Sequence, residues 1–227
     1  MRSCERRPLS GEPLDRMRLI PALVTTTTVI VMVVPGAPTD AADIRWSSVP
    51  DINQPVTLSH AEMAPRCSVT TPPLTTRSLG PVRPGQSLRD LEKACPTLRY
   101  GWYWNEGSPY PVVLLRLGEA AVMVELSEAT PTSAVDRITT ASPVRTTDGF
   151  GPGSRLSAMM RAWGKPHFAV GECALYVWFA TRPGLSFSVE VPETLDCLAR
   201  GRIESTGDAS LLPAGTRVGP VLLFTRN

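Results

Sequence analysis

The sequence predicts an α+β protein made of two tandem repeats, each a short helix packed on an antiparallel β-meander. The motif Pro-Gly-Gln-Ser-Leu at residues 84–88 opens a short amphipathic segment, and it returns in outline as Pro-Gly-Ser-Arg-Leu at residues 152–156. Apolar segments with the alternation of strands follow each copy. The same order of turn, helix and strands in both halves indicates a tandem duplication.

Residues 1–42 are predicted to be an upstream extension and a secretory signal peptide. Arg16, Met17 and Arg18 form a basic start to an apolar run over residues 19–34, and small and proline-rich residues follow. Met17 is the favoured start codon, because residues 1–15 are polar. A membrane anchor is the alternative, but a span needs about 20 apolar residues, and this run is shorter and interrupted by threonines at 25–28. We therefore expect a periplasmic or extracellular protein with no stable membrane span after cleavage.

Residues 43–78 are rich in proline, threonine and serine, a composition that does not sustain helical or alternating patterns. We expect an extended arm here, pinned to the body by Cys67. The two repeats follow it, over residues 79–143 and 144–227.

The first repeat begins with a capped helix. Ser87 is a natural N-cap, with Asp90 three residues later, and Pro96 ends the helix. Strands are expected at residues 112–117, 121–126 and 135–140, with a hairpin at residues 118–119. Apolar and other residues alternate over 122–126, so one face of this sheet is expected to be buried.

The second repeat follows the same plan. Ser154 is expected to cap a helix that carries Leu156 and Trp163 and ends at Gly164. Strands are expected at residues 173–180, 185–191 and 218–224, with a turn at residues 182–184 between the first two.

Four cysteines remain after removal of the signal: Cys67, Cys95, Cys173 and Cys197. An even number in an exported chain favours two disulfides, for which three connectivities are possible. We prefer Cys67 with Cys95 and Cys173 with Cys197, because each bond then closes a loop inside one repeat. Their spacing does not resemble a zinc site, so no metal is expected.

An aromatic cluster is the candidate partner-binding site. If residues 100–104 are extended, Trp102 and Trp104 project to the same side, and Tyr110 follows nearby. Tryptophan is enriched at binding hot spots. Core packing between the sheet and a helix is the alternative.

No catalytic residue, cofactor or nucleic-acid partner is predicted. The 23 basic and 21 acidic residues leave a net charge of +2, which gives a polyanion no electrostatic footprint. His60 and His167 are the two histidines, and no GxSxG or HExxH motif accompanies them. The glycine run at residues 149–153 is interpreted as a turn, because Pro152 removes a phosphate-binding N–H. The carboxylates in the pairs Glu125 with Glu128 and Glu190 with Glu193 are expected on solvated faces.

The stretch at residues 84–91 resembles the turn and first helix of the repeats of β-lactamase-inhibitor proteins, and a single copy is similar to the small BamE-type outer-membrane assembly lipoproteins. Both resemblances imply binding to other proteins rather than catalysis. The chain lacks the lipid-bearing cysteine of the lipoproteins. We therefore expect a noncatalytic protein-binding or envelope-assembly module. A secreted hydrolase with a site assembled only in three dimensions and a secreted enzyme inhibitor are the alternatives.

Overall fold

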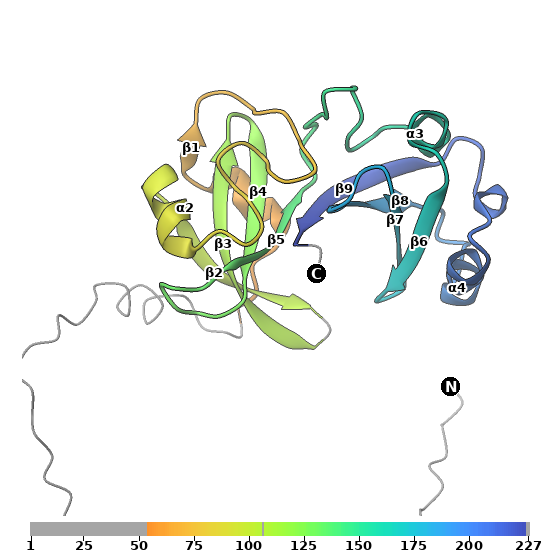
Figure 1. The fold of residues 1–227 in the computed structure, drawn as a ribbon. Coiled ribbons are helices and arrows are strands. Elements are labelled where there is room, and N and C mark those ends of the chain that lie inside the picture. Colours follow the sequence, from red (N-terminus) through yellow and green to blue (C-terminus); the bar gives the residue numbers. More distant parts are fainter. Residues whose placement is uncertain (1–53, 106, 226–227) are drawn as a thin grey trace, which may run out of the picture. The chain divides into compact units, whose positions relative to one another are not determined.

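The structure, a computed structural model, describes residues 54–105 and 107–225, which all belong to one compact unit, Thr39–Asn227. The predicted extension and signal peptide, and the first residues of the predicted arm, lie outside the described residues. The described chain has an α+β fold, in which helices flank a nine-stranded sheet (Figure 1).

The first half of the fold is helix α2 (Leu88–Ala94) followed by four consecutive antiparallel strands. These are β2 (Arg99–Asn105), β3 (Ser108–Leu117), β4 (Ala120–Leu126) and β5 (Val135–Thr140). The predicted helix and three predicted strands are present, and β2 was not predicted. Ser87 caps α2 as expected, since its Oγ accepts the backbone N–H of Asp90 at 3.2 Å.

The second half also consists of a helix followed by four strands, with further helices before the last strand. Helix α3 (Leu156–Trp163) precedes β6 (Pro166–Gly171), β7 (Ala174–Phe179) and β8 (Leu185–Glu190). Helix α4 (Cys197–Thr206) and the one-turn η2 (Ala209–Leu211) separate β8 from β9 (Arg217–Phe224). The strands predicted at 173–180, 185–191 and 218–224 correspond to β7, β8 and β9, whereas β6 and α4 were not predicted.

The predicted cap of α3 is wrong. The Ser154 hydroxyl accepts the backbone N–H of Gly151 at 3.0 Å, so it stabilises the preceding turn. The helix begins one residue later, with Arg155 at the N-cap position and no side-chain cap hydrogen bond.

The two halves meet through their last strands. The strand order is β1-β3-β4-β5-β9-β8-β7-β6, and β2 also pairs with β3. Strands β5 and β9 are antiparallel, with Ile138 opposite Leu223 and Thr139 opposite Leu222. Each half therefore contributes a four-stranded meander to one continuous sheet, and the short β1 (Arg66–Ser68) adds a parallel pairing to the end of β3.

The turns before α2 and α3 make the same backbone hydrogen bonds to the last strand of their own half. The backbone N–H of Gly85 donates to the Val135 carbonyl at 2.7 Å, and that of Gly153 donates to the Val218 carbonyl at 2.6 Å. The strand residues donate back to the residue after each glycine: the backbone N–H of Val135 to the Gln86 carbonyl at 2.8 Å, and that of Val218 to the Ser154 carbonyl at 2.9 Å.

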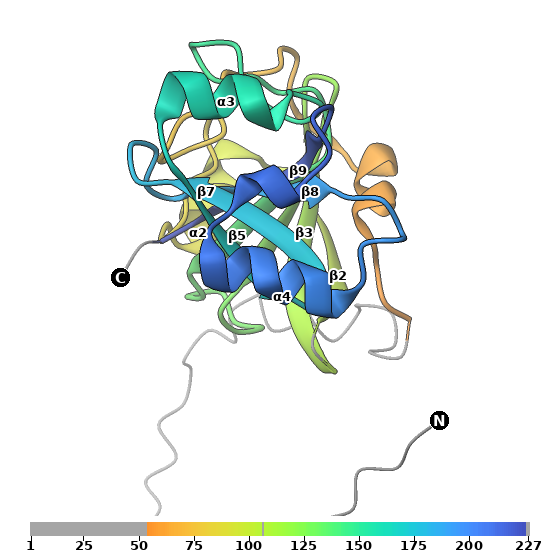
Figure 2. The ribbon, with the colours of Figure 1, turned by 90° about the vertical axis from the view of Figure 1, so that its right-hand side faces the viewer.

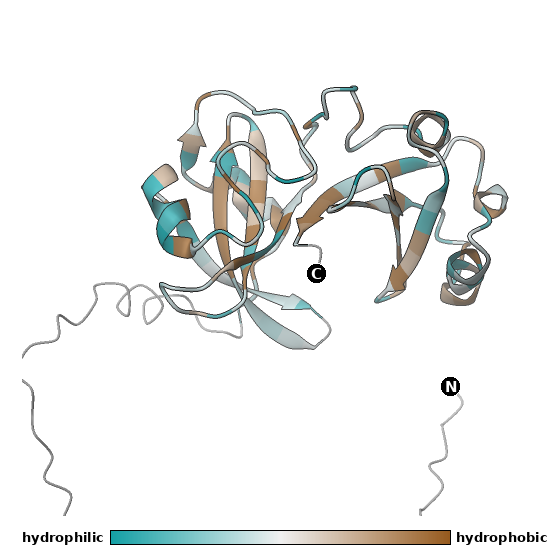
Figure 3. Ribbon diagram, in the orientation of Figure 1, coloured by the Kyte–Doolittle hydropathy of each residue, from teal (hydrophilic) through white to brown (hydrophobic). Residues whose placement is uncertain are grey.

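One face of the sheet carries the main core. Helices α3 and α4 contribute Trp163 and Ile203 to this core. In Figure 2, α4 lies in front of the sheet and α3 lies above β7 and β8. Hydrophobic residues concentrate in the strands, whereas α2 is largely hydrophilic (Figure 3). Leu88 of α2 and Leu156 of α3 are 1% and 3% exposed and belong to the same apolar cluster. The strands fill this cluster from alternate positions, because successive side chains point to opposite faces.

The opposite face is covered only in part. The 3₁₀-helix η1 (Leu58–Met63) lies over β3 and β4, where Ala61 and Val56 pack against Leu114 and Met123. Strand β4 is consequently buried on both faces, and not on one as predicted. The described part of the predicted arm contains the 3₁₀-helix η1 and the short strand β1.

Both disulfides join cysteines of the same half. Cys67 pairs with Cys95, and Cys173 pairs with Cys197, with Cα atoms 4.8 and 5.1 Å apart. This is the connectivity that the sequence analysis preferred. The first bond ties β1 to the end of α2, and the second ties the β6–β7 turn to the start of α4.

Candidate functional site

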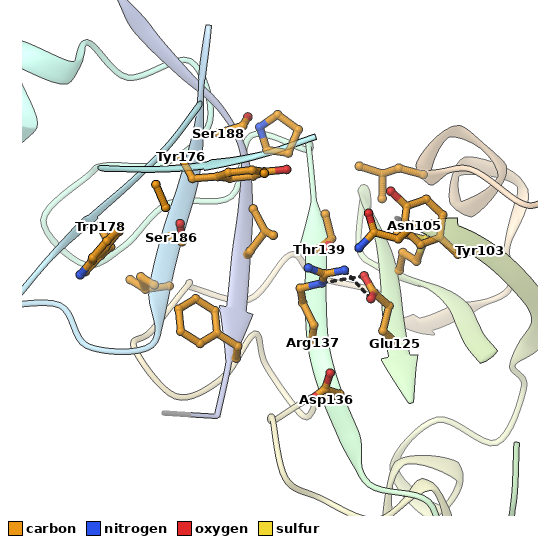
Figure 4. A pocket seen from close by; sticks show the side chains of 18 of the residues that line it. Tyr103, Asn105, Glu125, Asp136, Arg137, Thr139, Tyr176, Trp178, Ser186 and Ser188 are labelled. Carbon is orange, nitrogen blue, oxygen red and sulfur yellow. Dashed lines mark hydrogen bonds and ion pairs between the residues drawn. The ribbon is translucent and has the colours of Figure 1, made fainter. Parts of the chain in front are cut away.

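A concavity of about 930 Å³ lies on the sheet face opposite the helices and is the candidate functional site. Both halves line it, with side chains from β2, β4 and β5 on one side and β6 to β9 on the other (Figure 4). The alternation of β8 explains this composition: Leu185, Phe187 and Val189 fill the core, so Ser186 and Ser188 face the concavity.

A buried ion pair lies in the concavity wall. Glu125 of β4 and Arg137 of β5 are directly opposite in the sheet register. Arg137 donates through Nε and Nη2 to the two Glu125 carboxylate oxygens, over 2.8 and 2.6 Å. Glu125 is 3% exposed, so its predicted place on a solvated face is wrong. Glu128, Glu190 and Glu193 are exposed as expected.

Burial and the Glu125 carboxylate act in opposite directions on the guanidinium. Burial lowers the pKa of Arg137, but the hydrogen bond and the charge of Glu125 outweigh burial, and the net shift of its pKa is upward. Arg137 therefore stays charged, and its charge and that of Glu125 compensate each other.

Two tyrosines approach this ion pair from opposite sides. Tyr103 of β2 and Tyr176 of β7 both line the concavity, with Arg137 and Thr139 between them in Figure 4. Burial, followed by the nearby Glu125 charge, raises the pKa of Tyr103. The hydroxyl of Tyr103 is therefore neutral at pH 7.

Asn105 connects the two halves across the concavity. With its amide oriented to suit its neighbours, its nitrogen donates to Glu172 Oε2 and its oxygen accepts from Arg137 Nη2, both at 3.3 Å. The tip of the β2–β3 hairpin therefore meets the tip of the β6–β7 hairpin.

The β6–β7 turn is conformationally strained. Glu172 and Cys173 have φ angles of 46° and 66°, and they are the two non-glycine residues with positive φ in the described chain. This region costs a residue with a Cβ roughly 1 kcal/mol or more. The Cys173–Cys197 disulfide holds the turn, and Arg200 donates to the Cys173 carbonyl.

The far side of the concavity carries a stacked aromatic pair. His167 of β6 and Trp178 of β7 are sheet partners, and their ring centroids are 5.4 Å apart at 20°. Trp178 lines the concavity. In β7 the half-buried rings of Tyr176 and Trp178 alternate with side chains that are buried in the core, those of Leu175, Val177 and Phe179.

The residues of the predicted aromatic site lie on both faces of the β2–β3 hairpin, with Trp102 and Trp104 on the same side of β2. Trp102 and Trp104 are opposite Pro111 and Pro109, on the other side of β2 from Tyr103, whereas Tyr110 is directly opposite Tyr103. None of the three lines the concavity. Trp104 is 40% exposed, and Trp102 and Tyr110 are half-buried. Partner binding by these three residues stays a prediction.

Sequence analysis did not assign a site to the residues that do line the concavity, and it named Glu125 only as a solvated carboxylate. The alternation in β7 was a signal for Tyr176 and Trp178, since it separates a core side from an open side. No local signal pairs Glu125 with Arg137 or places Asn105 beside Glu172, because these contacts follow from the sheet register and from the meeting of two distant hairpins.

The two histidines have structural contacts. Nδ1 of His60 accepts the backbone N–H of Thr57 at 2.9 Å as part of the cap of η1, and His167 stacks on Trp178. Within the described residues no group of three or more His, Cys, Asp or Glu side chains could hold a metal ion. The same residues include no helix long and apolar enough to span a bilayer.

Comparison with known proteins does not assign this chain to a family. No protein-family model matches the chain, and no curated protein is significantly similar to it. The chain is similar to the crystal structure of the uncharacterized protein YfeY from Escherichia coli, at 16% sequence identity and a TM-score of 0.41, over 70% of this chain and 99% of that chain. The resemblance to β-lactamase-inhibitor proteins and BamE-type lipoproteins therefore stays a prediction.

Proposed function

We propose that this protein is an exported, noncatalytic binding module that holds a segment of a protein partner against the concave sheet face. The carrying observation is the concavity itself, about 930 Å³ in volume and lined by both halves of the sheet. Tyrosine, tryptophan and arginine, the residue types enriched at the energetic centres of protein interfaces, all line it. The two disulfides support an oxidising compartment outside the cytoplasm.

We further propose that the fold arose by tandem duplication of a helix-plus-meander unit. The order α2, β2 to β5 is matched by α3, β6 to β9, and the last strands of the two meanders pair with each other. The matching hydrogen bonds at Gly85 and Gly153 support the same origin. Duplication explains why one sheet offers a wide concave face that neither half could form alone.

The hydrolase alternative gains no support from the two imidazoles. His60 is part of a helix cap and His167 stacks on Trp178, whereas a hydrolytic site needs an imidazole that contacts both a nucleophile and a carboxylate. The cysteines at residues 67, 95, 173 and 197 are in disulfides and cannot act as thiolate nucleophiles.

Site-specific photo-crosslinking tests the binding face. The photoreactive residue p-benzoylphenylalanine would replace Leu222 or Ser188 in the concavity, Trp104 on the other side of β2, or Arg161 on the exposed side of α3. We expect the two concave positions to form an adduct with one protein of defined mass in the exported fraction of the native host. Arg161 is the matched control and should form none.

Adducts should then be confirmed with the purified partner. Leu222→Arg is expected to weaken its binding at least tenfold, because it places a charge in the apolar part of the interface. Equal crosslinking from Arg161, or undiminished binding by Leu222→Arg, would overturn the concave face as the binding site. Adducts from Trp104 alone would instead favour the aromatic segment that the sequence analysis singled out.

A further inference from the structure

The net charge of the residues that line the concavity is opposite in sign to that of the whole chain. Glu125, Asp136 and Glu172 face or border it, and Arg137 is the one basic residue among them, which gives the lining a formal net charge of −2. The whole chain has a net charge of +2. An anionic ligand would therefore meet a repulsive field here, and a cationic one an attractive field.

The charges within the lining are not equivalent. Arg137 is neutralised by its two hydrogen bonds to Glu125, and Asp136 lies at the margin of the concavity in Figure 4. Glu172 is exposed, and its carboxylate reaches Asn105 on the opposite hairpin, within 3.3 Å. The acidic group placed to meet an incoming ligand is consequently Glu172.

Aromatic rings flank the same space. Tyr103 and Tyr176 approach from opposite sides, and Trp178 lies farther along β7 (Figure 4). A cation over such rings is attracted by their electron-rich faces, most strongly where water is partly excluded. The upward shift in the pKa of Tyr103, caused by burial and then by Glu125, is what a desolvated site of net negative charge produces.

We infer that the concave face selects a partner segment that presents a cationic side chain, arginine or lysine, which enters between Tyr103 and Tyr176 and pairs with Glu172. This inference rests on the proposed function and names the partner chemistry for that same face. The Cys173–Cys197 disulfide holds the turn that carries Glu172, and the Asn105 amide contacts its carboxylate at 3.3 Å before the ligand arrives. Such preorganisation reduces the entropy cost of binding.

The experiment uses small probes of matched shape. The exported chain with both disulfides formed is titrated with N-acetyl-arginine amide, its neutral isostere N-acetyl-citrulline amide, or N-acetyl-glutamate amide. Binding is followed by NMR at the backbone amides of Asn105, Gly171 and Tyr176. We expect saturable shifts with the arginine probe, an affinity about tenfold lower with citrulline, and weakening of arginine binding by added salt.

Two variants complete the test. Glu172→Gln should lower the affinity for the arginine probe about tenfold, through loss of a charge-assisted hydrogen bond, whereas Glu193→Gln, an exposed glutamate outside the concavity, should not change it. Equal binding of arginine and citrulline, or an unchanged affinity in Glu172→Gln, would overturn the inference. If either of these two results were accompanied by partner adducts at Leu222, the proposed binding function would stand and only the inference of a cationic side chain would fall. Arginine-specific binding without any partner adduct would instead reject the proposed function.

Discussion

Gly85 and Gly153 occupy the same position in two matching turns. Their φ angles are 82° and 83°, each follows a proline, and each donates its backbone N–H to the last strand of its own half. The residue after each glycine closes the turn by donating to the carbonyl three residues back, over 3.3 Å and 3.0 Å. A Pro-Gly pair with positive φ at glycine is the arrangement of a type II turn.

The two glycines should therefore respond alike to substitution. Gly85→Ala and Gly153→Ala are each expected to lower the free energy of unfolding by about 1–2 kcal/mol, because a Cβ disfavours this backbone region. Steric contact is not the cause, since no heavy atom lies within 3.4 Å of the added Cβ at either site. Urea unfolding of the single variants measures both effects.

Gly215 provides the control for that pair. Its φ is not in the positive region and an added Cβ would meet open space, so Gly215→Ala should be neutral or stabilising by up to about 1 kcal/mol. A large loss at one of the two turn glycines and none at the other would contradict the equivalence of the turns.

The sequence predicted the parts of the fold that depend on local signals. Ser87 and Pro96 bound α2 because capping and proline act within one turn, and the apolar patterns located β4, β7 and β8 within about one residue. Strand β3 begins at Ser108, four residues before its predicted start. The sequence failed at Ser154 because a hydroxyl near a helix start can accept either from the helix or from the preceding turn, and here it accepts from Gly151.

The candidate site could not be predicted in the same way. Glu125 lies on the face of β4 that alternation alone would leave wet, but η1, which comes from the proline-rich segment, covers part of that face, and Arg137 pairs with the carboxylate. The concavity also needs the pairing of β5 with β9, which brings Arg137 opposite Phe224. Both are contacts between segments far apart in the chain, and periodicity carries no information about them.

Asp148 makes part of the stability depend on acid pH. Burial raises its pKa, but hydrogen bonds from Thr146, Trp163 and Arg182 outweigh this, and its pKa lies well below the ordinary value of 3.8. Trp163 Nε1 and Arg182 Nη2 donate to the same oxygen, over 2.6 and 2.7 Å. A depressed native pKa stabilises the folded state above pH 3.8, and that contribution is lost as the pH falls further.

Asp148→Asn should therefore be less stable than the wild type at pH 7, by about 1 kcal/mol for a partly exposed charged hydrogen bond. The difference should shrink as the pH falls below 3.8, because the wild type then loses the same charge. Unfolding curves between pH 7 and pH 2.5 measure this. Asp136→Asn, at an exposed aspartate of β5, should remain within about 0.5 kcal/mol of the wild type at pH 7. A constant difference over the whole range would contradict the role of Asp148.

The Glu125–Arg137 pair should show strong coupling in a double-mutant cycle. Arg137→Met leaves the buried Glu125 carboxylate without its partner and is expected to cost about 3 kcal/mol. Glu125→Met should cost less, because Arg137 keeps 29% of its side chain exposed to water. The double variant is expected within about 1 kcal/mol of the wild type. Additive losses in the double variant would show that the pair is not a unit.

Glu172 should lower the stability of the fold and favour binding of the cationic ligand. Its φ of 46° favours glycine, so Glu172→Gly should raise the free energy of unfolding by about 1 kcal/mol. The same change removes the carboxylate proposed to pair with a cationic side chain, so it should weaken the arginine probe as Glu172→Gln does. Glu193 has no positive φ, and Glu193→Gly should instead lower stability by about 0.5 kcal/mol through the greater freedom of the unfolded chain. If Glu172→Gly were both less stable and unchanged in binding, neither the strain of the β6–β7 turn nor its use in recognition would hold.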